Sequence, residues 1–103
     1  MNTLRKINKR NTRSIVVVIR VYFDKYNGSS YHTLRTYADG VCIDECPKTY
    51  GHDGLAKQRA TDRLIKHGAL RKQYKGQQID YVCEQMGITC AVEIIQCMRV
   101  KDL

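Results

Sequence analysis

Residues 14–46 read SIVVVIRVYFDKYNGSSYHTLRTYADGVCIDEC and contain three segments rich in β-branched and aromatic residues. Asn27-Gly28 separates the first segment from the second, and Asp39-Gly40 separates the second from the third. Such dipeptides are typical of tight hairpin turns, whose central residues need positive φ. The stretch therefore predicts three antiparallel strands, at residues 14–24, 30–38 and 41–46, and Pro47 is expected to end the third.

Helical patterns follow these strands. Residues 55–67 place an apolar residue at every fourth position, and Asp53 precedes them as a suitable N-cap. A second helical pattern covers residues 77–86 and ends at Gly87, and residues 89–100 return to the composition of a strand. The order β-β-β-α-α-β predicts an α+β fold, a two-layer sandwich in which helices cover one face of an antiparallel β-meander.

The length and the charge of the chain indicate one basic domain. The 103 residues contain 18 Lys and Arg against 10 Asp and Glu, a net charge of +8. Residues 1–13 hold five of these cations and no acid, so they predict a flexible basic arm ahead of a single domain at residues 14–103. A positive field of this kind attracts polyanions.

The composition also argues against several classes of protein. The longest apolar run, residues 15–19, is far shorter than the roughly 20 residues of a membrane span. No signal-peptide pattern is visible, and the number of cysteines, five, is odd. These features predict a cytoplasmic protein with free thiols and no membrane partner.

No motif indicates catalysis, a cofactor or a metal. Cys42, Cys46 and His52 resemble part of a zinc site, but structural zinc sites join two close ligand pairs and the second pair is missing here. Phosphate-binding loops, dinucleotide fingerprints and HExxH motifs are absent from the sequence. A non-enzymatic protein is therefore expected, and a small ribonuclease using His, Tyr, Arg or Lys is a third alternative.

The register of the first hairpin sorts the strand residues into two faces. A two-residue turn at Asn27-Gly28 places Arg20 opposite Arg35, and a second tight turn places Asp44 opposite Arg35 and Cys42 opposite Tyr37. One face is then apolar and is expected to lie under the helices, with the side chains of Ile15, Val17, Ile19, Val21, Phe23, Leu34, Ala38, Val41 and Ile43.

The other face combines tyrosines with arginines, which suggests nucleic-acid binding. Aromatic rings stack on unpaired bases, and cations neutralise phosphates. Further cations lie in the basic arm and in residues 54–79, where Asp62 is the only acid. The residues predicted to bind nucleic acid or a partner are Arg5, Lys6, Lys9, Arg10, Arg13, Arg20, Tyr22, Tyr31, Arg35, Tyr37, Arg59, Arg63, Lys66, Arg71 and Lys72.

Part of the chain resembles small uncharacterised proteins encoded by bacteriophages and plasmids. The resemblance covers residues 22–68 and rests on Asn27-Gly28, Ser30-Tyr31-His32, Leu34-Arg35, Asp39-Gly40 and Tyr50-Gly51. It implies an origin in a mobile element, in the cytoplasm of a host cell, and carries no established activity. Small phage proteins often block a host machine, as anti-CRISPR inhibitors and other anti-defence proteins do. The strand order also resembles the double-stranded-RNA-binding domain, without its first helix.

The sequence therefore favours two functions. The first is a basic binding protein that contacts nucleic acid through the tyrosine and arginine face and the N-terminal arm. The alternative is a phage-encoded inhibitor that binds a host defence complex, one that itself handles nucleic acid, by protein–protein contact. A homodimer is also left open, because the strand at residues 89–100 would offer an exposed edge to a second copy.

Overall fold

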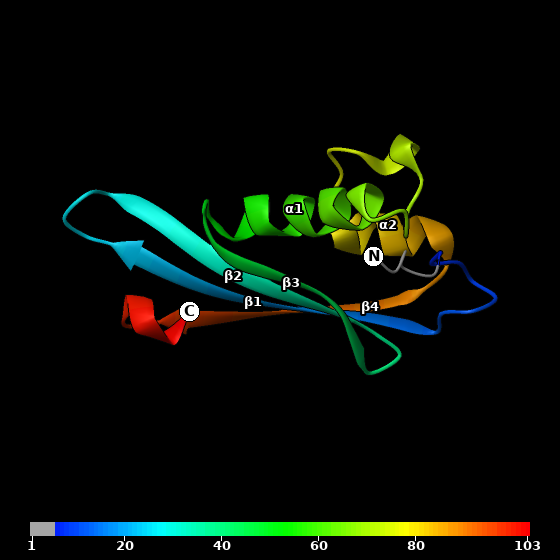
Figure 1. Ribbon diagram of the computed structural model, residues 1–103, viewed down its shortest axis with the longest axis horizontal. Coiled ribbons are helices and arrows are strands. Elements are labelled where there is room, and N and C mark those ends of the chain that lie inside the picture. The colour runs from blue at the N-terminus through cyan, green and yellow to red at the C-terminus, as the bar shows by residue number, and fades with distance from the viewer. Residues whose placement is uncertain (1–5) are drawn as a thin grey trace.

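The computed structural model describes residues 6–103 and contains one mixed four-stranded sheet (Figure 1). Its strands are β1 (Ser14–Asp24), β2 (Ser29–Ala38), β3 (Val41–Tyr50) and β4 (Thr89–Cys97), in the order β3-β2-β1-β4. The first three strands are antiparallel neighbours, and β4 lies parallel to β1. The parallel pairing follows from the helical connection after β3, which returns the chain to the end of the sheet where β1 also begins.

Both helices lie on one face of the sheet, as the expected two-layer α+β sandwich requires (Figure 1). They are α1 (Asp53–Lys66) and α2 (Ile79–Met86), and short 3-10 turns form η1 (Lys72–Tyr74) and η2 (Val100–Asp102). Neither helix within residues 6–103 has the length and apolar character needed to cross a bilayer. The order β-β-β-α-α-β is confirmed.

The N-cap of α1 differs from the prediction. His52 is the cap, and its Nδ1 accepts a hydrogen bond from the Gly54 backbone N–H at 3.0 Å. Asp53 is instead the first helical residue, where its negative carboxylate interacts favourably with the positive end of the helix dipole. Gly87 ends α2 in the left-handed region, with φ at +73°, as expected for a glycine at this position.

The register of the first hairpin is shifted by two residues from the prediction. Tyr22 faces Tyr31, and Val18 rather than Arg20 faces Arg35. The turn spans residues 25–28, because the carboxylate of Asp24 accepts hydrogen bonds from the backbone N–H groups that follow it. Side chains alternate between faces with a period of two, so this shift changes the cross-strand pairs but leaves every side chain on its predicted face.

The third strand also departs from the prediction, because it continues past Pro47 to Tyr50. Proline is tolerated here since β3 is an edge strand and an irregularity in its pairing occurs near Pro47. A second irregularity, between Thr36 and Tyr37 on β2, moves Asp44 to the helix side of the sheet. Glu45, not Asp44, therefore faces Arg35, whereas Cys42 does face Tyr37 as expected.

The core lies between the sheet and the helices. Its fully buried centre combines Ile15, Val17, Ile19 and Leu34 of the sheet with apolar residues of α1 and α2. Ala38 and Ile43 pack against this centre while remaining partly exposed.

Phe23 and Val41 were expected in the core, but both are exposed. They lie near strand ends, Phe23 just before the 25–28 turn and Val41 at the start of β3. Ile7, from the segment assigned to the basic arm, is instead buried in the core.

His32 is a fully buried ionisable side chain in this core. Its Nδ1 donates to the Gly51 carbonyl at 3.0 Å, and its Nε2 has no hydrogen-bond partner among the residues described. Burial lowers the pKa of His32, and although the bond to Gly51 acts in the opposite direction, the positive charge of Arg59 adds to the lowering.

The burial of His32 predicts a loss of stability in mild acid. Below about pH 6.5 the unfolded chain binds a proton at this residue while the native ring stays neutral. The free energy of unfolding should therefore fall as the pH drops below this value, by up to about 1.4 kcal/mol per pH unit, until the native ring also protonates. Urea denaturation at a series of pH values measures this fall, which His32→Gln should reduce. An unchanged fall in that variant would contradict the assignment.

Candidate nucleic-acid interface

The sheet divides the predicted binding residues into separate groups. Five of them lie on the open face, opposite the helices: Arg20, Tyr22, Tyr31, Arg35 and Tyr37. The remaining described residues of the set lie on the helices, on the connector between them or on the N-terminal segment. Arg5 lies outside the described residues. The predicted set is therefore not one continuous surface.

The arginines of the open face already have partners within the chain. Arg35 Nε lies 3.6 Å from Glu45 Oε1, and Arg20 Nη1 donates to the Asp102 carbonyl at 3.2 Å. They line a groove of about 320 Å³ together with Val18, Thr33, Leu34, Tyr37, Glu45, Cys46, Pro47 and Leu103. Because the carboxylate of Glu45 lines the groove beside the two arginines, the positive field of the groove is weakened.

One of the three predicted tyrosines of the open face, Tyr31, is also engaged. The rings of Tyr31 and Tyr50 meet edge to face with centroids 5.9 Å apart, and Lys48 Nζ lies 5.3 Å from the centroid of the Tyr31 ring. Cross-strand aromatic pairs of this kind stabilise a sheet by a few tenths of a kcal/mol to about 1 kcal/mol. This arrangement gives Tyr31 a structural role whether or not a base stacks on the face.

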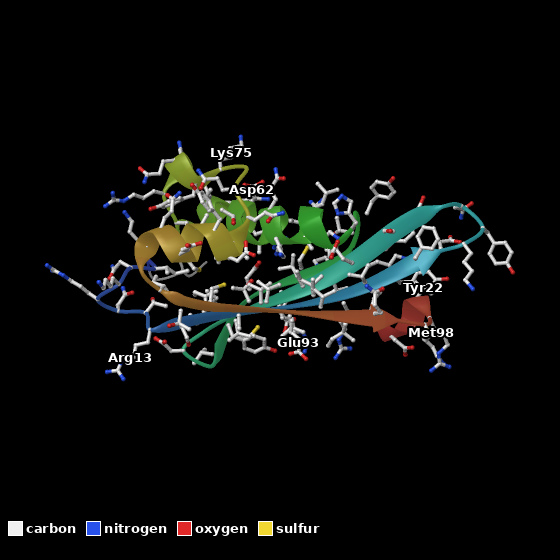
Figure 2. The ribbon with its side chains drawn as sticks, turned by 180° about the vertical axis from the view of Figure 1, so that it is seen from behind. Arg13, Tyr22, Asp62, Lys75, Glu93 and Met98 are labelled. Atoms are coloured by element: carbon white, nitrogen blue, oxygen red, sulfur yellow. The ribbon has the colours of Figure 1, made fainter. Side chains whose placement is uncertain are left out.

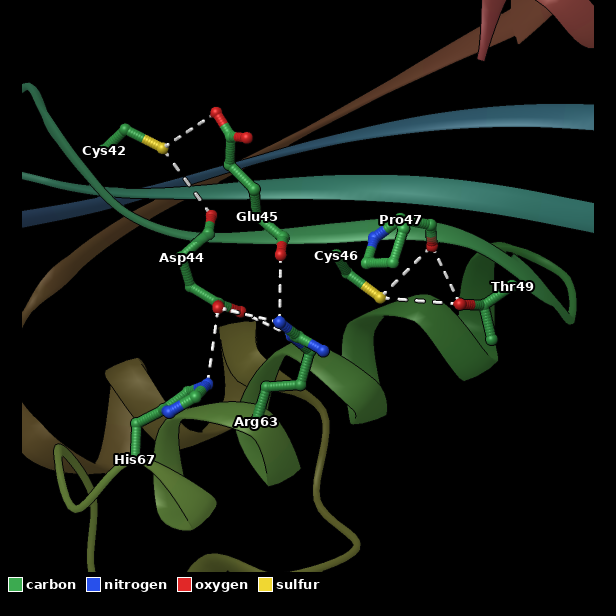
Figure 3. Close-up of polar contacts among 8 residues, drawn as sticks. All are labelled: Cys42, Asp44, Glu45, Cys46, Pro47, Thr49, Arg63 and His67. Carbon is green, nitrogen blue, oxygen red and sulfur yellow. Dashed lines mark hydrogen bonds and ion pairs between the residues drawn. The ribbon is translucent and has the colours of Figure 1, made fainter. Parts of the chain in front are cut away.

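Arg63 has a structural partner as well (Figure 3). Its guanidinium binds the Asp44 carboxylate through two hydrogen bonds, Nε to Oδ2 at 2.7 Å and Nη2 to Oδ1 at 3.0 Å. Nη2 also donates to the Glu45 carbonyl, and His67 Nε2 lies 3.6 Å from Asp44 Oδ1. The hydrogen bond and the charge of Asp44 raise the pKa of Arg63. Arg63 therefore joins α1 to β3, and little of its charge is free for a ligand.

The residues considered for zinc do not meet. Cys42 lies on the open side of the sheet, where its Sγ is near Glu45, whereas Cys46 is buried on the helix side and contacts Thr49 (Figure 3). His52 uses its Nδ1 to cap α1. Residues 6–103 contain no group of three or more side chains placed to hold a metal ion.

Two segments at one end of the molecule carry cations that have no such partners among the described residues. The Ile7 backbone N–H donates to the Ala69 carbonyl at 2.9 Å, which joins the N-terminal segment to the connector between α1 and α2. We call the exposed cations of these two segments the basic end: Lys6, Lys9, Arg10, Arg13, Arg71, Lys72 and Lys75. Lys75 was not in the predicted set. None of the seven forms an ion pair with a described residue.

The backbone of the basic end is held by local hydrogen bonds. The Asn8 carboxamide oxygen accepts from the Arg10 backbone N–H at 2.9 Å, and Asn11 Nδ2 donates to the Lys6 carbonyl at 2.7 Å. On the connector, Asp62 Oδ1 accepts from the Gly76 backbone N–H at 3.0 Å. Figure 2 shows Arg13 and Lys75 toward the same end of the molecule, on opposite sides of the sheet. The cations thus project from fixed segments.

A small cavity lies at the junction of the two segments. It has a volume of about 190 Å³ and is lined by Lys6, Ile7, Asn8, Ala69, Leu70, Arg71, Tyr74 and Met86. Tyr74 is half-buried and packs against the core, so most of its ring is not offered for stacking. The basic end is therefore suited to contacts with phosphates more than to contacts with bases.

The two remaining predicted cations lie elsewhere. Arg59 and Lys66 line a groove of about 350 Å³ between β3 and α1, together with Cys46, Pro47, Thr49, Leu55, Gln58, Asp62 and Arg63. Arg59 Nη2 donates to the Tyr50 carbonyl at 3.4 Å. This groove lies between the basic end and the hairpin, and its acid, Asp62, is already bound to the connector.

The chain was also compared with known proteins. Comparison with protein families, with curated proteins and with solved structures found no match.

Proposed function

We propose that this chain is a non-enzymatic nucleic-acid-binding protein whose basic end contacts the phosphate backbone. The observation that supports the proposal is the gathering of seven exposed cations without ion-pair partners among the described residues. Cations that neutralise phosphates release condensed counterions, which supplies most of the free energy of non-specific binding. The open face of the sheet, whose arginines have partners, takes a secondary part.

The chemistry of the basic end favours nucleic acid over an acidic protein. Protein interfaces usually have a central group of apolar and aromatic side chains that become buried on binding. At the basic end Ile7 is already buried in the core and Tyr74 is half-buried, so the exposed side chains are cations and neutral polar groups such as Asn8 and Gln73. A surface of this kind complements a chain of phosphates and reads little base sequence.

Fluorescence anisotropy with labelled oligonucleotides tests the proposal. We expect the native protein to bind single- and double-stranded oligonucleotides of unrelated sequence with similar affinities, with a Kd in the micromolar range that is typical of non-specific binding at physiological salt. The variant Arg20→Gln/Arg35→Gln/Lys48→Gln, which removes three cations from or beside the open face, should retain most of this affinity. Loss of binding in that variant, or no binding by the native protein, would overturn the proposal.

A second candidate function is supported by the opposite end of the molecule. The β1–β2 hairpin extends beyond α1 (Figure 1), and Tyr26 in its turn is 99% exposed. Phe23, Tyr50 and Leu55 are also exposed near this end. Exposed apolar groups of this kind are typical of protein interaction sites. They favour the inhibitor hypothesis, in which the chain binds a host complex. A pull-down with the tagged chain separates the two functions, because a protein partner would stay bound after nuclease treatment whereas nucleic acid would be lost.

A further inference from the structure

The two edges of the sheet are built differently. On the β3 edge, Pro47 and two irregularities in the pairing interrupt the strand, and Lys48 adds a charge. On the other edge, all nine residues of β4 pair with β1 in one continuous register, without proline, lysine or bulge. Natural proteins usually protect an edge strand with such features, because an unprotected edge pairs with other strands. The β3 edge combines several of these features, whereas the β4 edge has a single charge, that of Glu93.

The outer half of β4 is also incompletely covered by the helices. Ile94 pairs with the fully buried Ile19 and so points to the same side of the sheet, yet Ile94 is 39% exposed. Figure 2 shows α2 beside the start of β4, whereas Met98, which is itself exposed, lies just past the other end of the strand. An apolar side chain thus lies on an edge that pairs with no other strand of residues 6–103, and it is accessible to a strand of another molecule.

We propose that the free edge of β4 binds β4 of a second copy of this chain, in antiparallel pairing about a twofold axis at Ile94. In an antiparallel pair, directly opposed residues point to the same face of the sheet. A twofold axis perpendicular to the sheet therefore passes through a position where one residue faces the same residue of the second copy. An axis at Glu93, the only charged residue of the strand, would place two carboxylates side by side, which is destabilising. An axis at Ile94 instead places two apolar side chains together.

The charges of neighbouring residues agree with this register. With the axis at Ile94, Glu93 faces Ile95 of the second copy. Ile95 is in turn paired with Arg20 on β1, and both point to the open face. Each carboxylate therefore lies two strands, about 10 Å, from Arg20 of the other copy, and this arrangement occurs twice because the interface is symmetric. This complementarity favours a second copy over an unrelated strand.

The pairing would join the sheets of two copies into one eight-stranded sheet in the order β3-β2-β1-β4-β4-β1-β2-β3. The twofold axis is perpendicular to the sheet, so the helices of both copies lie on one face. The dimer would then carry two basic ends. The proposal does not depend on nucleic-acid binding, since the interface excludes the basic end and its test needs no oligonucleotide.

Sedimentation equilibrium of the full chain tests the dimer. We expect the mass to rise from 11.9 kDa toward twice this value as the concentration increases to hundreds of micromolar. Ile94→Lys should keep the chain at monomer mass, because two ammonium groups would meet at the axis. The matched control Val41→Lys adds the same charge at an exposed apolar position of β3, the opposite edge of the sheet, and should dimerise like the native chain.

Cysteine cross-linking tests the register and does not depend on the stability of the lysine variant. Directly opposed residues of antiparallel strands have Cβ atoms about 4.5–5.5 Å apart, near the distance that a disulfide spans. Under mild oxidation Ile94→Cys should form a covalent dimer well above the level of the native protein, and Val92→Cys should not. Monomer mass for the native chain at every concentration would overturn the proposal, as would equal cross-linking of the two cysteine variants.

Discussion

Replacing Lys9, Arg10 and Arg71 by glutamine is expected to weaken nucleic-acid binding about 100-fold at physiological salt. These three cations come from both segments of the basic end, and none forms an ion pair with a described residue. For each phosphate that is no longer neutralised, nearly one counterion fewer is released, which lowers the affinity about fivefold at this salt concentration. Three such factors multiply to roughly the stated value.

The fold should survive these substitutions. The three side chains are exposed, and the hydrogen bonds that hold the segments use backbone groups and Asn side chains. Exposed substitutions of this kind usually change the free energy of unfolding by less than about 0.5 kcal/mol each. The open-face variant Arg20→Gln/Arg35→Gln/Lys48→Gln loses the same number of charges, so it controls for net charge. An equal decrease of affinity in both variants would mean that binding follows total charge and not the basic end.

Replacing Asp44 by alanine is expected to lower the free energy of unfolding by about 3 kcal/mol. The Asp44 side chain is 6% exposed and accepts two hydrogen bonds from Arg63, whose side chain is 28% exposed. Without the carboxylate, a largely buried guanidinium keeps its charge and loses its partner. The cost of such an unpaired charge in a buried pair is about 3–5 kcal/mol, and the partial exposure of Arg63 places the expectation at the low end.

Urea denaturation of Asp44→Ala measures this loss, with Glu45→Ala as the matched control. Glu45 is the adjacent acid and pairs with Arg35, but both side chains are exposed, so its removal should cost less than about 1 kcal/mol. The double variant Asp44→Leu/Arg63→Met should recover much of the stability, because it removes both charges. Similar losses for Asp44→Ala and Glu45→Ala would contradict the role assigned to the buried pair.

Much of the fold could be predicted from local sequence. The Val and Ile run in β1 and the repeat of small and apolar residues in α1 each have a single structural interpretation, and both agree with the structure. The hairpin pairs could not be predicted, because Asn27-Gly28 suggests a two-residue turn while the Asp24 carboxylate stabilises a longer one. The extension of β3 past Pro47 depends on its place at the edge, which the sequence does not show.

The candidate site was predicted only in part. The sequence identified most cations of the basic end, but it gave equal weight to Arg35 and Arg63, whose partners Glu45 and Asp44 are set by a bulge. The hydrogen bond between Ile7 and Ala69 joins segments far apart in the sequence, so no local pattern shows it. The signal in the sequence for this contact is Ile7, an apolar residue within a basic segment.

The most direct test of the central claim is the salt dependence of oligonucleotide binding by the native chain and by Lys9→Gln/Arg10→Gln/Arg71→Gln. On double-stranded DNA, log K should fall linearly with log[salt], with a slope of about −0.9 for each phosphate neutralised. The variant should have a slope that is shallower by about 2.7, the contribution of the three cations removed. Identical slopes for the two proteins would show that these cations do not contact phosphate, and would contradict the account.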